Sequence, residues 1–146
     1  MSKKIILTIF IVISATIIAK LNAQSSEKDI VTEFFRIFEN EPIKAIDYAF
    51  STSKWMEKNT DGLESIKAKF SDILPLIGDY YGYDLIIEKS IGRNLKMQSY
   101  MLKYDRQPVR FTFILYNPNG KWQVQNLKWD LDISEELMES AKQNRN

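Results

Sequence analysis

The sequence contains no cysteine and no histidine among its 146 residues. The lack of both excludes the Ser-His-Asp triad, the Cys-His pair, every zinc motif built on these residues and the commonest general base near neutral pH. There is also no disulfide framework and no lipid attachment through an N-terminal cysteine. A hydrophobic core must hold the fold, and a domain of about 120 residues can build one because it buries well over half of its unfolded surface.

The first 23 residues have the pattern of a secretory signal peptide. Lys3 and Lys4 form a basic start, an apolar run over 5–19 follows, and Ala23 offers a small residue at a cleavage position. Lys20 cuts the apolar run below the ~18–20 residues that a membrane span needs, so cleavage is preferred over an uncleaved anchor. The sequence therefore predicts a signal peptide over 1–23 and a single domain over 24–146. That domain is expected to be exported, periplasmic or secreted, with no stable membrane anchor.

No surplus of positive charge remains after cleavage. Removing residues 1–23 takes away three lysines and no acidic residue, so 17 of the 20 basic residues stand against 19 acidic ones, a formal charge of −2. Binding to a phosphate backbone requires a basic footprint. We therefore expect no nucleic acid among the partners.

Apolar residues recur at steps of three and four in the first half of the domain, which predicts amphipathic helices. The three segments are 28–40, 42–50 and 61–78. Asp61, followed three residues later by Glu64, predicts the cap of the third helix. Pro75 is expected to kink or end this helix, and Gly78 to stop it. The segment between the second and third helices is interpreted as a linker.

From Tyr80 onward the apolar period changes to two, which predicts strands. The expected strands begin at Tyr80, at 95 after a Gly-Arg-Asn turn, at 109 and at 122, and a short helix follows over 133–142. Helices first and a meander of strands afterwards indicate an α+β fold. We expect three N-terminal helices packed on a bent antiparallel sheet, with a short C-terminal helix.

Several stretches resemble the nuclear transport factor 2-like superfamily, and in particular its small exported bacterial members. They are "GYDLIIEKSIG", "YMLKYDRQPVRFTFILYNPNGKW" and "LKWD". The resemblance implies a bent sheet that wraps a helix into a cone, a pocket inside that cone and a tendency to dimerise. It does not imply a reaction.

An enzymatic alternative follows from the same resemblance. Ketosteroid isomerases of this superfamily use carboxylates and a tyrosine in an apolar pocket, a chemistry that needs no histidine. The candidates here are Asp84 or Glu88 as the carboxylate, with Tyr83 or Tyr104 as the donor. The other interpretation is that both carboxylates lie on the solvated face of a half-buried strand, because charged residues are rarely buried unless paired.

No metal site and no cofactor are predicted. Residues 130–134, "DLDIS", begin like a calcium loop, but Glu135 stands where glycine is required and Ala141 where a bidentate glutamate belongs. Asp132 is instead expected to cap the last helix, with Glu135 at the capping-box position.

The stretch "FILYNPNGKWQVQNLKW" predicts a hairpin. Pro118 and Gly120 suit a type I turn followed by a left-handed residue, which gives a three-residue loop. The expected pairs are Tyr116 with Trp122, Ile114 with Val124, Phe111 with Leu127 and Val109 with Trp129. This register needs no further bulge.

The same register separates two apolar groups on opposite faces of the hairpin. The group that we expect to pack on the helices is Val109, Phe111, Leu127 and Trp129. The group at the tip, on the other face, is Ile114, Tyr116, Trp122 and Val124. An exposed apolar group of this kind marks an interaction site, so we predict a partner or a second copy there.

Arg110 is the remaining candidate. The predicted register places it opposite Lys128 with Asp130 diagonal to it. It either forms an ion pair with Asp130 or clamps a ligand carboxylate.

These observations favour a non-catalytic ligand-binding or protein-interaction module over an enzyme. The expected partners are a second copy bound through the sheet face, or an apolar small molecule. The alternative is a carboxylate–tyrosine isomerase or lyase that acts on an apolar small molecule in the cone pocket. Phenylalanine and tryptophan side chains that fill the inside of the cone would count against that enzyme.

Overall fold

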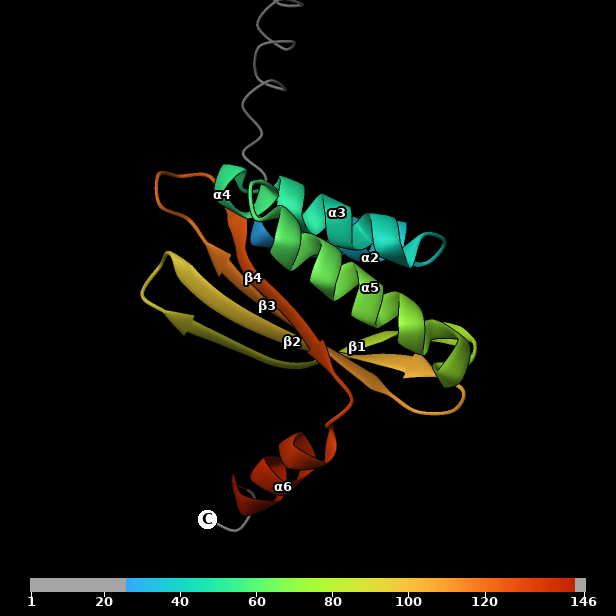
Figure 1. The fold of residues 1–146 in the computed structure, drawn as a ribbon. Helices are drawn as coiled ribbons and strands as arrows, with labels where there is room; N and C mark the ends of the chain where they lie inside the picture. The colour runs from blue at the N-terminus through green and yellow to red at the C-terminus, as the bar shows by residue number, and fades with distance from the viewer. Residues whose placement is uncertain (1–25, 144–146) are drawn as a thin grey trace, which may run out of the picture.

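The computed structural model describes residues 26–143 (Figure 1). The helices before the sheet are α2 (Glu27–Phe38), α3 (Pro42–Ser51), α4 (Lys54–Glu57) and α5 (Thr60–Ile77). The strands are β1 (Tyr80–Ile91), β2 (Leu95–Tyr104), β3 (Val109–Tyr116) and β4 (Gln123–Asp130), followed by α6 (Ser134–Gln143). The strands form an antiparallel sheet in the order β1-β2-β3-β4. The predicted α+β class is confirmed.

The helices lie on both sides of the sheet. Helices α2, α3 and α5 cover one face, which we call the inner face, and α6 lies on the opposite side, beyond the outer face (Figure 1). The predicted signal peptide lies outside the described residues. Within residues 26–143, no helix combines the length and apolar character that a bilayer span requires.

Helix α2 begins with a capping box. The Ser26 hydroxyl accepts from the Asp29 N–H at 3.2 Å, and the Asp29 carboxylate accepts from the Ser26 N–H at 2.7 Å. These two bonds satisfy N–H groups that a helix start leaves without partners. The buried side of α2 carries Ile30, Phe34 and Phe38, at the predicted spacing.

Helix α5 starts from a different cap than predicted and ends at the predicted glycine. Its cap is Asn59, whose side chain accepts from the Gly62 N–H at 3.1 Å, so the expected capping role of Asp61 is wrong. The helix also continues through Pro75, which lies in its last turn. It ends at Gly78, as expected, because φ is +87° there and the Asp105 carboxylate occupies the space that a Cβ would fill.

The segment interpreted as a linker contains α4, a single helical turn. Ser53 caps it by accepting from the Met56 N–H at 3.5 Å. Ser53 is itself buried, whereas Trp55 is 66 % exposed. The turn is short and carries no buried residue of its own.

The core is an aromatic layer between the helices and the inner face. Phe34 packs edge-to-face on Phe113, with ring centroids 4.9 Å apart, and stacks on Phe38 at 5.5 Å. Phe70 of α5 packs edge-to-face on Phe111 at 5.2 Å. Edge-to-face pairs of this kind add to the stabilisation that burial alone provides.

Strand β3 shows how the sheet sorts its side chains. Val109, Phe111, Phe113 and Leu115 are fully buried on the inner face. The alternating residues point to the outer face: Arg110, Thr112, Ile114 and Tyr116. This is the two-residue period of a strand, and it makes both faces of β3 apolar near the tip.

The predicted register of the β3–β4 hairpin is wrong. Leu115 pairs with Val124, Phe113 with Leu127, and Phe111 with Trp129. The connection is also longer than the predicted three-residue loop, because β3 ends at Tyr116 and β4 begins at Gln123. Gly120 has the expected positive φ, +89°.

A bulge explains the difference. The register shifts between Ile114 and Leu115, which leaves Gln125 as an extra residue in β4. The extra residue brings Val124 to the same inner face as Leu127 and Trp129, where Val124 is fully buried. The apolar residues of β4 therefore belong to one face. Their change of parity in the sequence marks the bulge and not two separate patches.

Candidate functional site

The candidate catalytic residues do not converge on one site. Asp84 is exposed and pairs with Lys103, with Nζ 3.3 Å from Oδ1. Tyr83 stacks on Phe35 with ring centroids 3.7 Å apart, and Tyr104 packs against Tyr80 at 5.4 Å. No hydrogen bond in the described part of the chain links these tyrosines to a carboxylate.

Glu88 belongs to a chain of polar contacts at the edge of the inner face. It accepts from the Gln98 amide at 2.6 Å, and its other oxygen lies 3.3 Å from the Lys96 ammonium. Lys96 also donates to Glu27 at 2.6 Å, and the Tyr100 hydroxyl donates to Gln98 at 3.2 Å. The sequence analysis missed Lys96, Gln98 and Tyr100. All three have even residue numbers in β2, which places them on one face of the strand. This alternation was the signal in the sequence that could have identified the cluster.

These contacts do not suit acid–base catalysis. The hydrogen bond from Gln98 holds the pKa of Glu88 below its ordinary value, and the bond from Lys96 does the same for Glu27. Burial raises the pKa of Tyr100 to about 12. A catalytic group works best with a pKa close to the operating pH, and these three groups move away from neutrality.

The interior of the fold is occupied by side chains. Phe34, Phe35, Phe38, Phe113 and Tyr100 pack against one another where the resemblance implies a pocket. Each of these residues is at most 9 % exposed. This is the arrangement that counts against the isomerase.

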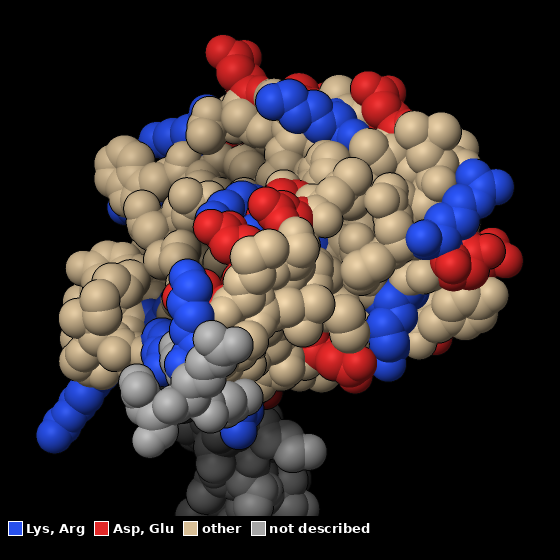
Figure 2. Space-filling model, turned by 90° about the horizontal axis from the view of Figure 1, so that it is seen from below, with Lys and Arg blue, Asp and Glu red and all other residues tan. Residues whose placement is uncertain are grey.

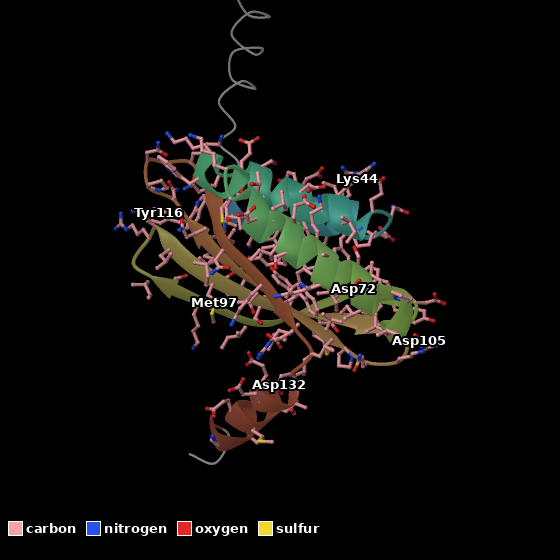
Figure 3. All side chains as sticks on the ribbon, in the orientation of Figure 1. Lys44, Asp72, Met97, Asp105, Tyr116 and Asp132 are labelled. Carbon is pink, nitrogen blue, oxygen red and sulfur yellow. The ribbon has the colours of Figure 1, made fainter. Side chains whose placement is uncertain are left out.

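The outer face of the sheet has an apolar end. Ile91 pairs with Leu95 and Leu95 with Tyr116, and the neighbouring row pairs Met97 with Ile114. We call these five residues the outer strip. Ile91 is 77 % exposed and Tyr116 38 %. Met97 lies on the side of the sheet away from α2, α3 and α5 (Figure 3). Figure 2, which views the molecule from below, shows broad areas of uncharged side chains between separate charged groups.

A small pocket opens in the outer strip. Its volume is about 230 Å³, and Ile91, Leu95, Met97 and Ile114 line it together with Lys89 and Lys96. Pockets that bind drug-sized ligands measure about 300–1,000 Å³. The volume therefore fits one side chain better than a whole small molecule.

In the row next to the outer strip, the two central strands carry hydroxyl groups. Ser99 pairs with Thr112, both are buried, and their hydroxyls lie 3.1 Å apart. The apolar surface therefore narrows at this row, where Ile87 of β1, the partner of Ser99, continues it.

The predicted tip group is only partly realised. Ile114 and Tyr116 lie in the outer strip, but Val124 is fully buried on the inner face and Trp122 packs partly buried against the core. The bulge causes this separation. Sequence reasoning missed Ile91, Leu95 and Met97, although Ile91 and Leu95 flank the Gly-Arg-Asn turn and thus had to lie side by side.

Arg110 lies opposite Asp130, and the predicted pairing with Lys128 is wrong because of the changed register. Its Nε and Nη2 contact the Asp130 carboxylate at 3.0 and 3.1 Å, and Nη1 donates to Glu136 of α6 at 2.9 Å. Burial opposes the charge, but these carboxylates raise the pKa of Arg110. All three nitrogens contact carboxylates of the same chain, so the ion pair with Asp130 is observed, and the ligand clamp stays a prediction.

Comparison of the chain with protein-family models, with curated proteins and with solved structures gives no match.

Proposed function

We propose that this protein is an exported, non-catalytic interaction module of the nuclear transport factor 2-like type. Its partner is a second copy of the chain, bound through the outer strip. Export is supported by the signal-like pattern of residues 1–23. The superfamily assignment is supported by the order of the elements, with N-terminal helices covering one face of an antiparallel meander.

The observation that carries the proposal is the exposure of the outer strip. Its residues form two adjacent cross-strand rows, and no described helix or loop covers Ile91, at 77 % exposure. A contiguous exposed apolar patch of this kind marks an interaction site. The pocket of about 230 Å³ within it suits an inserted side chain, which favours a protein partner over an apolar small molecule.

A second copy fits the chemistry of the strip. In a two-fold interface the same surface meets itself, so charged residues in the patch would repel their own copies. The five residues of the strip carry no charge, and Lys89 lies at the end of one row, on edge strand β1. Met97 and Tyr116 are side-chain types enriched at interfaces.

Sedimentation velocity of the purified protein tests this function. We expect a dimer for the natural sequence, and a dissociation constant raised about a hundredfold in a variant that combines Ile91→Lys and Met97→Lys, because each unpaired ammonium must lose its water. Leu76→Lys is the matched control, since Leu76 is 62 % exposed on α5, away from the strip.

Circular dichroism separates loss of association from loss of fold. A monomeric double variant that keeps the natural far-ultraviolet spectrum and a cooperative melting transition supports the proposal; its melting temperature should fall because dimerisation no longer stabilises the fold. A natural protein that stays monomeric at its highest soluble concentration contradicts it, and so does a double variant that dimerises as well as the natural protein.

A further inference from the structure

A second surface, separate from the outer strip, lies between α5 and β4. It is a groove of about 510 Å³ whose apolar lining includes Phe50, Ile66, Leu127 and Trp129. Helix α5 contributes the small residues Gly62 and Ser65 to its wall. Because neither side chain is large, the helix leaves space beside the strand.

Strand β4 forms an edge of the sheet. In the order β1-β2-β3-β4 it has a neighbour on one side alone, so its other side lacks a strand. An edge presents unpaired N–H and C=O groups that can pair with another chain. Residues 125–129 of this edge line the groove.

The direction of the free backbone groups follows from one observed bond. The Val124 N–H donates to the Thr52 hydroxyl at 2.9 Å, away from β3, and Val124 lies on the inner face. The bulge at Gln125 interrupts β4, but the β3 residues that face Val124, Leu127 and Trp129 alternate regularly. Residues on one face of a regular strand point their backbone groups to the same side. Leu127 and Trp129 share the inner face, so their N–H and C=O groups point into the groove.

The charged side chains that line the groove indicate what kind of segment it binds. Lys69 and Lys128 line it, and none of its lining residues is acidic. Neither lysine takes part in an ion pair among residues 26–143. Two ammonium groups beside an apolar floor favour a segment that carries carboxylates next to apolar side chains.

We infer that this groove binds an extended, acidic segment of a partner polypeptide, which adds to β4 as a fifth strand of the sheet. Its backbone pairs with the free N–H and C=O groups of Leu127 and Trp129. One set of alternate side chains is apolar and packs on Ile66 and Trp129. The other set is acidic and faces Lys128, which lies on the outer side of β4. This is recognition by strand addition, in which the backbone supplies affinity and the alternate side chains supply specificity.

The probe is a synthetic peptide, acetyl-Val-Glu-Val-Glu-Val-Glu-amide, titrated into protein purified from expression of the complete sequence. We expect the amide protons of Leu127 and Trp129 to exchange more slowly in nuclear magnetic resonance spectra when the peptide is bound, because they gain hydrogen bonds. The peptide with lysine in place of glutamate should bind at least about tenfold more weakly, since it places like charges beside Lys128.

Two further controls separate strand addition from simple attraction of charge. A peptide that is N-methylated at alternate residues keeps its charge but loses half of its donors, and it should lose binding in one of the two methylation patterns. In the protein, Lys128→Glu should weaken binding about tenfold, whereas Lys44→Glu, on exposed α3, should leave it unchanged.

Three results would overturn the inference. The first is equal binding of the glutamate and lysine peptides, and the second is full binding by both N-methylated peptides. The third is the absence of any change in exchange at Leu127 and Trp129 at saturating peptide, which would mean that Lys128 simply protects the edge against pairing. None of these results bears on the outer strip, because self-association is measured separately.

Discussion

Replacing Arg110 with methionine tests the link between the sheet and α6. Arg110 is 9 % exposed and contacts three carboxylates: Asp130 at 3.0 Å, Glu136 at 2.9 Å and Glu135 at 3.8 Å. Methionine preserves much of the apolar stem and removes the charge. Without the guanidinium group, the three carboxylates repel one another and lose their hydrogen-bond donor.

The expected loss can be estimated from the exposure of the partners. Removing one member of a fully buried ion pair costs about 3–5 kcal/mol. The side chains of Asp130 and Glu136 are 31 % and 28 % exposed, so their hydration by water offsets part of this cost. We therefore expect the free energy of unfolding to fall by about 2–3 kcal/mol. We also expect α6 to detach from the sheet, because Glu135 and Glu136 hold it there.

Urea unfolding and limited proteolysis measure the two effects. The Arg110→Met protein should unfold at lower urea and lose its C-terminal segment to protease before the remainder of the chain. Lys103→Met is the matched control, because Lys103 forms a single contact with Asp84 and the two side chains are 42 % and 57 % exposed. Such a surface pair contributes less than about 1 kcal/mol. Equal destabilisation by both substitutions, or an α6 that stays resistant to protease, would refute the reasoning.

Two further substitutions test features of the inner face. Thr52→Val should lower the free energy of unfolding by about 1–3 kcal/mol, because the partly buried N–H of Val124 loses its acceptor, while Thr52→Ser should restore most of it; equal stability of the valine and serine variants would disprove this. Lys96→Met should destabilise the protein at neutral pH, but the difference from the natural protein should shrink at low pH. Glu27 and Glu88 have pKa values below the ordinary 4.5, so their contribution is complete above that value and is lost as the pH falls through their folded pKa values. Urea unfolding at several pH values measures this, and a difference that grows on acidification would contradict it.

The sequence predicted the strands and the longer helices of this fold because periodicity reports burial directly. Helix α4 is a single turn, too short to show a period. The apolar residues of α2 recur at helical spacing, and the sheet residues alternate, so each period could be assigned to an element. The end of α5 at Gly78 was also predictable, because few residues other than glycine adopt a positive φ. The cap was not predicted, because Asn59 and Asp61 are both good capping residues and lie two positions apart.

The local sequence does not determine the register of the β3–β4 hairpin. The turn signal of Pro118 and Gly120 fits a short loop, but the position of Val124 is decided by the inner face, where it is fully buried. A single extra residue, Gln125, reverses which face every later residue occupies. The same error assigned Trp122 and Val124 to the exposed patch and placed Arg110 opposite the wrong residue.

The candidate site was predicted in part for the same reason. Ile114 and Tyr116 precede the bulge, so their assignment to the outer face did not depend on the register of β4. The rest of the outer strip comes from β1 and β2, whose apolar residues are separate in the sequence and meet only through strand pairing. Cross-strand neighbours become visible only when the pairing of Ile91 with Leu95 is known.

The central claim is that two copies meet through the outer strip, and a distance between the copies tests it most directly. Because the chain has no cysteine, Lys89→Cys provides a unique site for a spin label beside the strip, and Leu76→Cys provides one on α5. Two sheets packed face to face lie about 10 Å apart, so pulsed electron paramagnetic resonance should give a short distance between labels at residue 89 and a clearly longer one at residue 76. The absence of a dipolar signal at residue 89, or a shorter distance at residue 76, would contradict the account.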